Sequence, residues 1–216
     1  VGGGFSNSAT YKGSGAFTGS LFTNAAAGHV APGNSPGCQT FGSGFTSSGN
    51  VDIEINGITT ACTDYDKITV TGTATLSGTL NVTVGYTPTN GDQVTIIDAT
   101  TVSGTFATLN APGGWTVLYN TPTTGKVTLS YTTPPATGEY RSITTGNWGD
   151  GSTWERYNGT AWVPAGTGPT SADDAITIRN GHIITLNSAF TVDQVIVNAG
   201  GTLTLLGSGM LTLNDG

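Results

Sequence analysis

Residues 200–213 read GGTLTLLGSGMLTL and contain two near-copies of one tetrapeptide, Thr202–Leu205 and Met210–Leu213. In both copies leucine alternates with threonine or another residue, and glycines separate the copies. Alternation with a period of two is typical of a β-strand with one buried face. Similar short strands joined by glycine turns favour a parallel β-solenoid, in which successive coils place like residues on like residues. Antiparallel hairpins of a β-sandwich fit the same pattern and remain the alternative.

The same rhythm continues upstream of this stretch. Strand-like segments occupy 175–178, 183–186 and 192–197, and their starts lie about eight to ten residues apart. Further upstream, Val51, Ile53 and Ile55 alternate with polar residues. We therefore expect short strands along the whole chain, each with one face buried and one face in solvent.

The composition also favours an all-β protein. The 216 residues include 34 glycines, and only 9% of the residues are charged. No segment carries apolar residues at helical spacing over three turns. Threonine, valine and isoleucine favour pleated surfaces because their branched Cβ restricts the first side-chain torsion.

A proline-rich segment divides the sequence. Residues 134–139 begin with Pro134-Pro135, which stiffen the chain and prevent strand pairing. We expect a Gly/Thr-rich β-repeat module over 1–133, a linker over 134–139, and a second solenoid-like module over 140–216 with an aromatic entry segment.

The charge excludes some classes of partner. The formal net charge is −7 and the sequence pI is about 4.4. Nucleic-acid binding and polybasic attachment to a membrane both need a basic surface. No apolar run approaches the roughly 20 residues that span a bilayer.

Cys38 and Cys62 are the two cysteines of the chain. One interpretation is a pair of free, buried thiols. The other is a disulfide that closes a loop of about 24 residues, which we favour because the other features indicate an oxidising compartment. Neither cysteine has a second cysteine or a histidine at metal-ligand spacing.

The first module shows a family resemblance. It carries Ala31-Pro32-Gly33-Asn34-Ser35-Pro36-Gly37, then Val51–Gly57, then Asp64–Gly72. Residues 28–133 with these motifs resemble the β-helical passenger repeats of bacterial autotransporter-type adhesins. The resemblance implies a β-helix that is exported and displayed at the cell surface.

The second module resembles another group. Gly146-Asn147-Trp148, Ser152-Thr153-Trp154-Glu155 and Ile178–His182 leading into Gly200–Leu203 are similar to a repeat module of large surface proteins secreted by the type IX pathway. Members of such families act as adhesins, surface filaments or stalks. The resemblance covers 140–216 and implies a secreted, extracellular or cell-surface location.

Aromatic residues of the second module are candidates for a ligand platform, since sugars stack on aromatic faces. The alternative is a small core that covers the beginning of this module. The candidates are Trp148, Trp154, Tyr157 and Trp162.

Three acidic residues are weak candidates for calcium, which prefers several oxygen ligands from loops. These are Asp64, Asp66 and Asp150, and none fits the twelve-residue EF-hand pattern. We therefore expect no cofactor other than calcium.

Catalytic machinery is not evident in the sequence. Asp52 with Glu54, and Asp173 with Asp174, are candidate carboxylate pairs for glycoside hydrolysis. For Asp52 and Glu54 we favour the interpretation that they lie on a solvated strand face, where charge discourages aggregation. No serine lies in a Gly-x-Ser-x-Gly elbow, and His29 and His182 are expected to be structural or solvent-facing.

We therefore expect an extracellular structural or adhesive surface protein that is not an enzyme. Copies of the chain are the expected partner, joined end to end in a filament. The alternative is a carbohydrate-binding module that recognises surface glycans.

Overall fold

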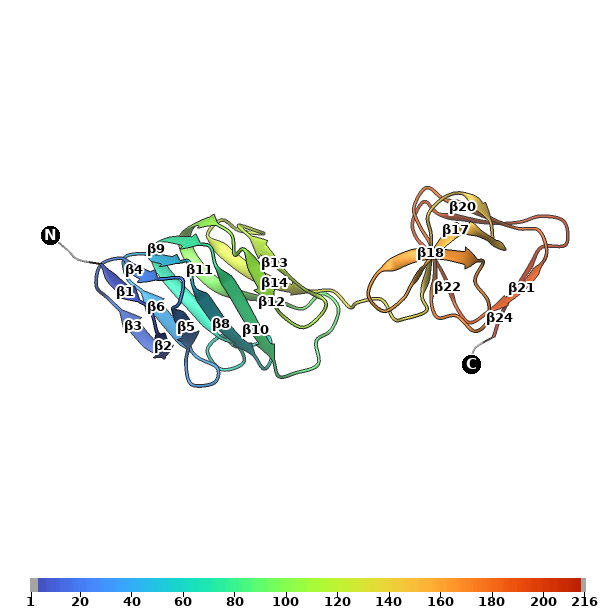
Figure 1. Cartoon of the computed structure of the whole chain (residues 1–216). Helices are drawn as coiled ribbons and strands as arrows, with labels where there is room; N and C mark the ends of the chain where they lie inside the picture. Colours follow the sequence, from blue (N-terminus) through green and yellow to red (C-terminus); the bar gives the residue numbers. More distant parts are fainter. Residues whose placement is uncertain (1–3, 215–216) are drawn as a thin grey trace. The chain divides into compact units, whose positions relative to one another are not determined.

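The computed structural model describes residues 4–214 and shows 24 strands and no helix in that range. The chain forms two compact units that divide between Pro134 and Pro135 (Figure 1). The expected all-β class is confirmed.

Unit 1 contains two sheets. The first has the order β1 (Phe5–Asn7), β4 (Phe22–Asn24), β7 (Phe45–Ser47), β9 (Lys67–Leu76), β11 (Gln93–Gly104), β14 (Lys126–Tyr131) and β13 (Trp115–Tyr119), with β3 (Gly15–Phe17) and β6 (Cys38–Phe41) joined to β9. The second has the order β12 (Thr108–Asn110), β10 (Thr79–Val84), β8 (Asn50–Ile55), β5 (His29–Pro32) and β2 (Thr10–Gly13).

Strand pairing in unit 1 is parallel until the chain reaches β13 and β14. Each strand pairs with a strand from the next passage of the chain, so the strands follow one another along the unit in sequence order (Figure 1). The first half of β9 pairs with β6 and its second half with β7, so this long strand replaces two short ones. Strand β14 then pairs antiparallel with the free edge of β11, and β13 pairs antiparallel with β14.

Parallel register places like residues on like residues in unit 1. Phe22 pairs with Phe45, and Phe17 with Phe41. The rings of Phe41 and Phe45 stack with centroids 4.7 Å apart. An aromatic pair of this kind contributes about 0.5–1.5 kcal/mol beyond its buried area.

A ladder of buried amides accompanies the phenylalanines. The Asn7 Nδ2 donates to the Asn24 Oδ1 at 2.9 Å, and the Asn24 Nδ2 donates to the Ser47 Oγ at 3.1 Å. The same amides donate to the carbonyls of His29 and Asn50, at 3.0 and 2.9 Å. The ladder therefore satisfies backbone groups where the chain passes from one sheet to the other.

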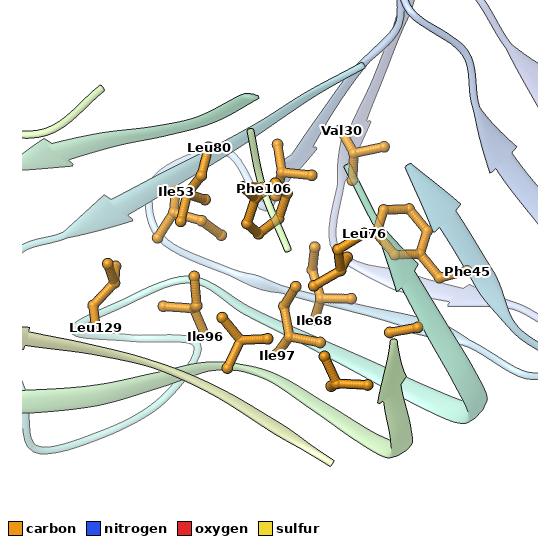
Figure 2. Packing of buried hydrophobic residues seen from close by; sticks show 14 of the residues in the cluster. Val30, Phe45, Ile53, Ile68, Leu76, Leu80, Ile96, Ile97, Phe106 and Leu129 are labelled. Carbon is orange, nitrogen blue, oxygen red and sulfur yellow. The ribbon is translucent and has the colours of Figure 1, made fainter. Parts of the chain in front are cut away.

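Aliphatic residues of the two sheets meet in the core of unit 1. Ile53 and Leu80 lie opposite Ile96, Ile97 and Leu129 (Figure 2), and none of these side chains exposes more than 1% of its surface. The alternation predicted at Val51, Ile53 and Ile55 is confirmed, since all three are buried.

Unit 2 has three sheets. The first sheet has the order β18 (Trp162–Thr167), β17 (Asp150–Tyr157), β15 (Tyr140–Ser142), β19 (Ile176–Ile178) and β22 (Val195–Val197). The second has the order β16 (Gly146–Asn147), β20 (Ile183–Leu186) and β23 (Thr202–Leu205). The third pairs β21 (Ala189–Val192) with β24 (Met210–Leu213). Strands β15 to β17 and β17 to β18 pair antiparallel, and the remaining pairs are parallel.

The two near-copies at 202–205 and 210–213 do not stack on each other. Strand β23 pairs with β20, and β24 pairs with β21. Both copies lie in one passage of the chain, so their ladders form with the preceding passage instead. Leu203 lies on Ile184, and Thr212 lies on Thr191.

Part of the expected linker over residues 134–139 is hydrogen-bonded in the structure. The Gly138 N–H donates to the Tyr157 carbonyl at 2.9 Å, and the Ala136 N–H donates to the Glu139 Oε1 at 2.9 Å. The first of these bonds ties Gly138 to β17 of unit 2, which begins at Pro135.

This division predicts that limited proteolysis with a broad-specificity protease cuts first near Pro134–Pro135. Two stable fragments should appear by mass spectrometry, because each unit has its own core. Earlier cleavage within 176–213 would contradict the division.

Candidate functional site

A polar hollow of about 360 Å³ lies on the outer face of the sheet formed by β2, β5, β8 and β10. Charged and amide side chains from three strands and two loops line it. They include Lys12, Asn34, Asp52, Glu54, Asp66 and Asn81.

The hollow exists because β5 and β8 separate. They pair only at His29 with Asn50 and Val30 with Val51. Beyond Pro32 the chain turns away through Gly33, whose φ of 73° suits glycine. A Cβ at Gly33 would lie 2.5 Å from the Gly37 backbone, so the turn needs glycine for space as well.

Asp66 fills the gap that this separation leaves. Its Oδ1 accepts the Gly37 N–H at 2.6 Å, and its Oδ2 accepts the Glu54 N–H at 2.8 Å. Its own N–H donates to the Glu54 carbonyl at 2.9 Å. The carboxylate thus replaces the missing strand neighbour of β8 and ties β8 to the 33–37 turn.

Burial governs the ionisation of Asp66, whose surface is only 1% exposed. Burial raises the pKa of Asp66 to about 6, against the lowering effect of the hydrogen bonds from the Glu54 and Gly37 N–H groups. The charge of Glu54 raises the pKa further.

Asp52 belongs to a chain of side chains along the same face. Its Oδ2 contacts the His29 Nδ1 at 2.7 Å, and its Oδ1 accepts from the Asn81 Nδ2 at 2.7 Å. Asn110 in turn donates to Asn81 at 2.8 Å. Asp52 is therefore held in place by two partners, and His29 serves as one of them.

The disulfide lies beside Asp66 in the fold. It joins Cys38, the neighbour of Gly37, to Cys62 in the loop that leads to Asp66. The predicted pairing is present in the structure, and it tethers the same two segments that the Asp66 carboxylate bridges.

The calcium candidates serve as turn caps. The Asp64 Oδ2 accepts the Thr60 N–H at 2.8 Å, and the Asp150 Oδ1 accepts the Ser152 N–H at 2.9 Å. Asp66 bridges backbone N–H groups as described above. Within residues 4–214 the structure brings no three acidic, histidine or cysteine side chains into a metal-binding group.

The structure separates the four candidates for an aromatic platform. Trp148 and Trp154 are fully buried, and their indole N–H groups donate to the carbonyls of Pro169 and Trp148 at 3.0 and 2.8 Å. The core interpretation is therefore correct for these two, and the platform interpretation is wrong for them. They fill the interior beneath the β17–β18 hairpin, where small side chains would leave a void.

Tyr157 and Trp162 remain partly accessible on that hairpin, with ring centroids 5.4 Å apart. The Arg141 guanidinium lies 4.1 Å from the centroid of the Trp162 ring. One face of Trp162 therefore already has a cationic partner from its own chain.

Ser142 and His182 form a pair that the sequence did not indicate. The Ser142 Oγ lies 2.8 Å from the His182 Nδ1 and accepts the Arg179 N–H at 2.9 Å. Ser142 is fully buried, so no substrate reaches the hydroxyl. The pair links β15 to the turn after β19.

Asp173, from the other candidate carboxylate pair, caps the Thr170 turn and lies 3.6 Å from the Arg156 Nε.

No family model, curated protein or solved structure matches the chain. In the part of the chain that the structure describes, no helix is long and apolar enough to cross a membrane.

The disulfide predicts that thiol titration of the denatured, unreduced protein finds no free thiol. Replacing both cysteines by serine should lower the free energy of unfolding by about 3 kcal/mol, because a loop of this length then gains freedom in the unfolded chain. Two titratable thiols would show that the bond does not form in solution.

We predict that the contribution of Asp66 to the free energy of unfolding falls as pH rises. The folded protein keeps this proton to about pH 6, whereas the unfolded chain releases it near the ordinary value of 3.8. The contribution is therefore fully present below about pH 4 and is lost by pH 7. Two pKa units correspond to about 3 kcal/mol.

The test compares the protein with Asp66→Asn by urea unfolding between pH 4 and pH 7. The unfolding free energy of the variant minus that of the parent should rise by up to about 3 kcal/mol over this range. A difference that stays constant with pH would contradict the assignment.

Proposed function

We propose that the chain is an extracellular structural protein with an adhesive role, built from two β-solenoid units. The in-register parallel pairing in both units supports this interpretation. The disulfide supports an oxidising location. The low charge favours a structural role over catalysis. Ser142, the hydroxyl side chain that contacts His182, is fully buried, which favours the same role.

The observation that carries the proposal is the uncovered core at the last strands of unit 2. Ile178, Leu186 and Val192 are fully buried. Their register partners in the next passage are Val197, Leu205 and Leu213, which point to the same side of each sheet but expose 45%, 53% and 60% of their surface. These three side chains continue the core rows, and no further row covers them within residues 4–214.

Unit 1 has a similar feature at its first strand. Phe5 pairs with the fully buried Phe22, yet Phe5 is 41% exposed. Strands β1 and β2 lie at sheet edges in the described part of the chain, as do β22, β23 and β24. Open edges recruit further strands, and exposed apolar rows recruit further apolar surface.

A second copy of the chain is the occupant that we propose for these ends. The first strands of unit 1 offer parallel edges and an apolar row to the last strands of unit 2 of a neighbour. Such a contact joins two different surfaces, so it propagates into a filament unless the rotation closes a ring.

The proposal predicts concentration-dependent association, measured by light scattering and electron microscopy of the purified protein. The double variant Leu205→Lys with Leu213→Lys should weaken association by about tenfold or more, because two charges would be buried at the contact. Both residues are more than half exposed, so folding should be preserved.

Ile58→Lys provides the matched control. Ile58 is 39% exposed and lies outside the strands, between β8 and β9. This variant should associate as the parent does. Monomers at every concentration, or equal loss in the control, would overturn end-to-end assembly.

A further inference from the structure

A second, smaller hollow adjoins the polar hollow of unit 1. It has a volume of about 170 Å³ and lies at the corner between β2 and β3. Lys12 lines both hollows, so the two meet at this side chain.

Gln39 gives the smaller hollow an unsatisfied acceptor. The side chain lines this hollow and its residue is only 3% exposed. Its Nε2 donates to the Ala31 carbonyl at 3.3 Å, whereas its Oε1 has no partner. A buried carbonyl oxygen without a donor is costly, and such groups are rare in folded proteins.

The glycines at the corner leave the smaller hollow beside the buried Gln39. Gly15 is the register partner of Gln39, and it has no side chain to cover the amide. A Cβ placed on Gly13 or Gly15 would meet no atom within 4 Å. The backbone at both positions has positive φ, 115° and 143°, which disfavours the larger residues that would fill the space.

Lys12 differs from the other basic residues. The chain has six lysines and arginines, and the other five each form an ion pair with a carboxylate. Within residues 4–214 Lys12 forms no ion pair, although Glu54 and Asp66 line the same hollow. Its three ammonium donors are therefore available between the two hollows.

The charged and amide side chains that line the two hollows determine which class of ligand can bind there. An anion would meet Glu54 and Asp52, and a cation would meet Lys12. A neutral molecule with many hydroxyl groups can donate to the Gln39 Oε1 and the Glu54 carboxylate while it accepts from Lys12.

We propose that the two hollows form one binding site for a neutral saccharide, with Lys12 at its centre and Gln39 at its inner end. The site gives the proposed adhesive role a ligand class and rests on that role. End-to-end assembly is tested separately, so failure of sugar binding leaves that test unaffected.

The test begins with a glycan array that holds neutral, acidic and amino sugars. Titration calorimetry of dilute, monomeric protein with the strongest neutral glycan then measures the dissociation constant. Glucose, glucuronate and glucosamine, compared at millimolar concentration by saturation-transfer NMR, share one ring configuration. Relative to glucose, glucuronate carries a carboxylate at C6 and glucosamine carries an ammonium group at C2. Neutral glycans should bind, and their charged counterparts should bind more weakly.

Two variants test the assigned groups. Gln39→Leu removes the acceptor and Lys12→Met removes the donors, and each should weaken binding by about tenfold or more. Lys12 is exposed, so Lys12→Met keeps the test informative even if the Gln39 variant fails to fold.

Trp162→Ala in unit 2 is the control. This variant should bind the neutral glycan as the parent does. Loss of binding in Trp162→Ala with retention in both unit 1 variants would overturn the proposal and place the ligand on the hairpin. Absence of binding to every neutral glycan, or binding of amino sugars alone, would overturn it as well.

Discussion

In-register parallel pairing is the constraint on which the rest of this structure depends. When a strand pairs in parallel with the next passage of the chain, every side chain lies beside its register partner. Core residues then continue core rows, as Phe22 does with Phe45, and outer residues continue outer rows, as Asp52 does with Asn81. A shift by one residue would turn every core side chain toward solvent. The buried ladder from Asn7 to Ser47 opposes such a shift, because the amides find their partners in one register only.

The sequence was sufficient to predict those features that depend on local patterns. Strict alternation at Val51–Ile55 predicts a half-buried strand, and consecutive prolines at 134 and 135 predict a break between units. The disulfide between Cys38 and Cys62 was favoured over two free thiols because the other features indicated an oxidising compartment, and the structure contains the bond. The resemblance to adhesin repeats and to type IX-secreted modules stays a prediction.

Features that depend on distant contacts were not predictable in this way. The near-copies at 202–205 and 210–213 suggested mutual stacking, but similar sequences at successive positions of one passage carry no information about which passage they pair with. Trp148 and Trp154 had two interpretations, and only the position of the β17–β18 hairpin decides between them. The sequence did not indicate the observed roles of Asp66 and Gln39, because these depend on the separation of β5 and β8 and on the glycine that faces Gln39.

The early separation of β5 from β8 interrupts the regular pairing of unit 1, and it also creates the polar hollow. Where β5 leaves β8, two backbone N–H groups lose a strand neighbour, and a buried carboxylate with a raised pKa replaces it. The Cys38–Cys62 bond restrains the two segments that this carboxylate joins. Lys12 and Gly15 lie on β2 and β3, which are also the first strands of the unit. The proposed ligand in the smaller hollow and the proposed neighbouring copy would therefore use the same surface, so the two proposals share the first passage of the chain.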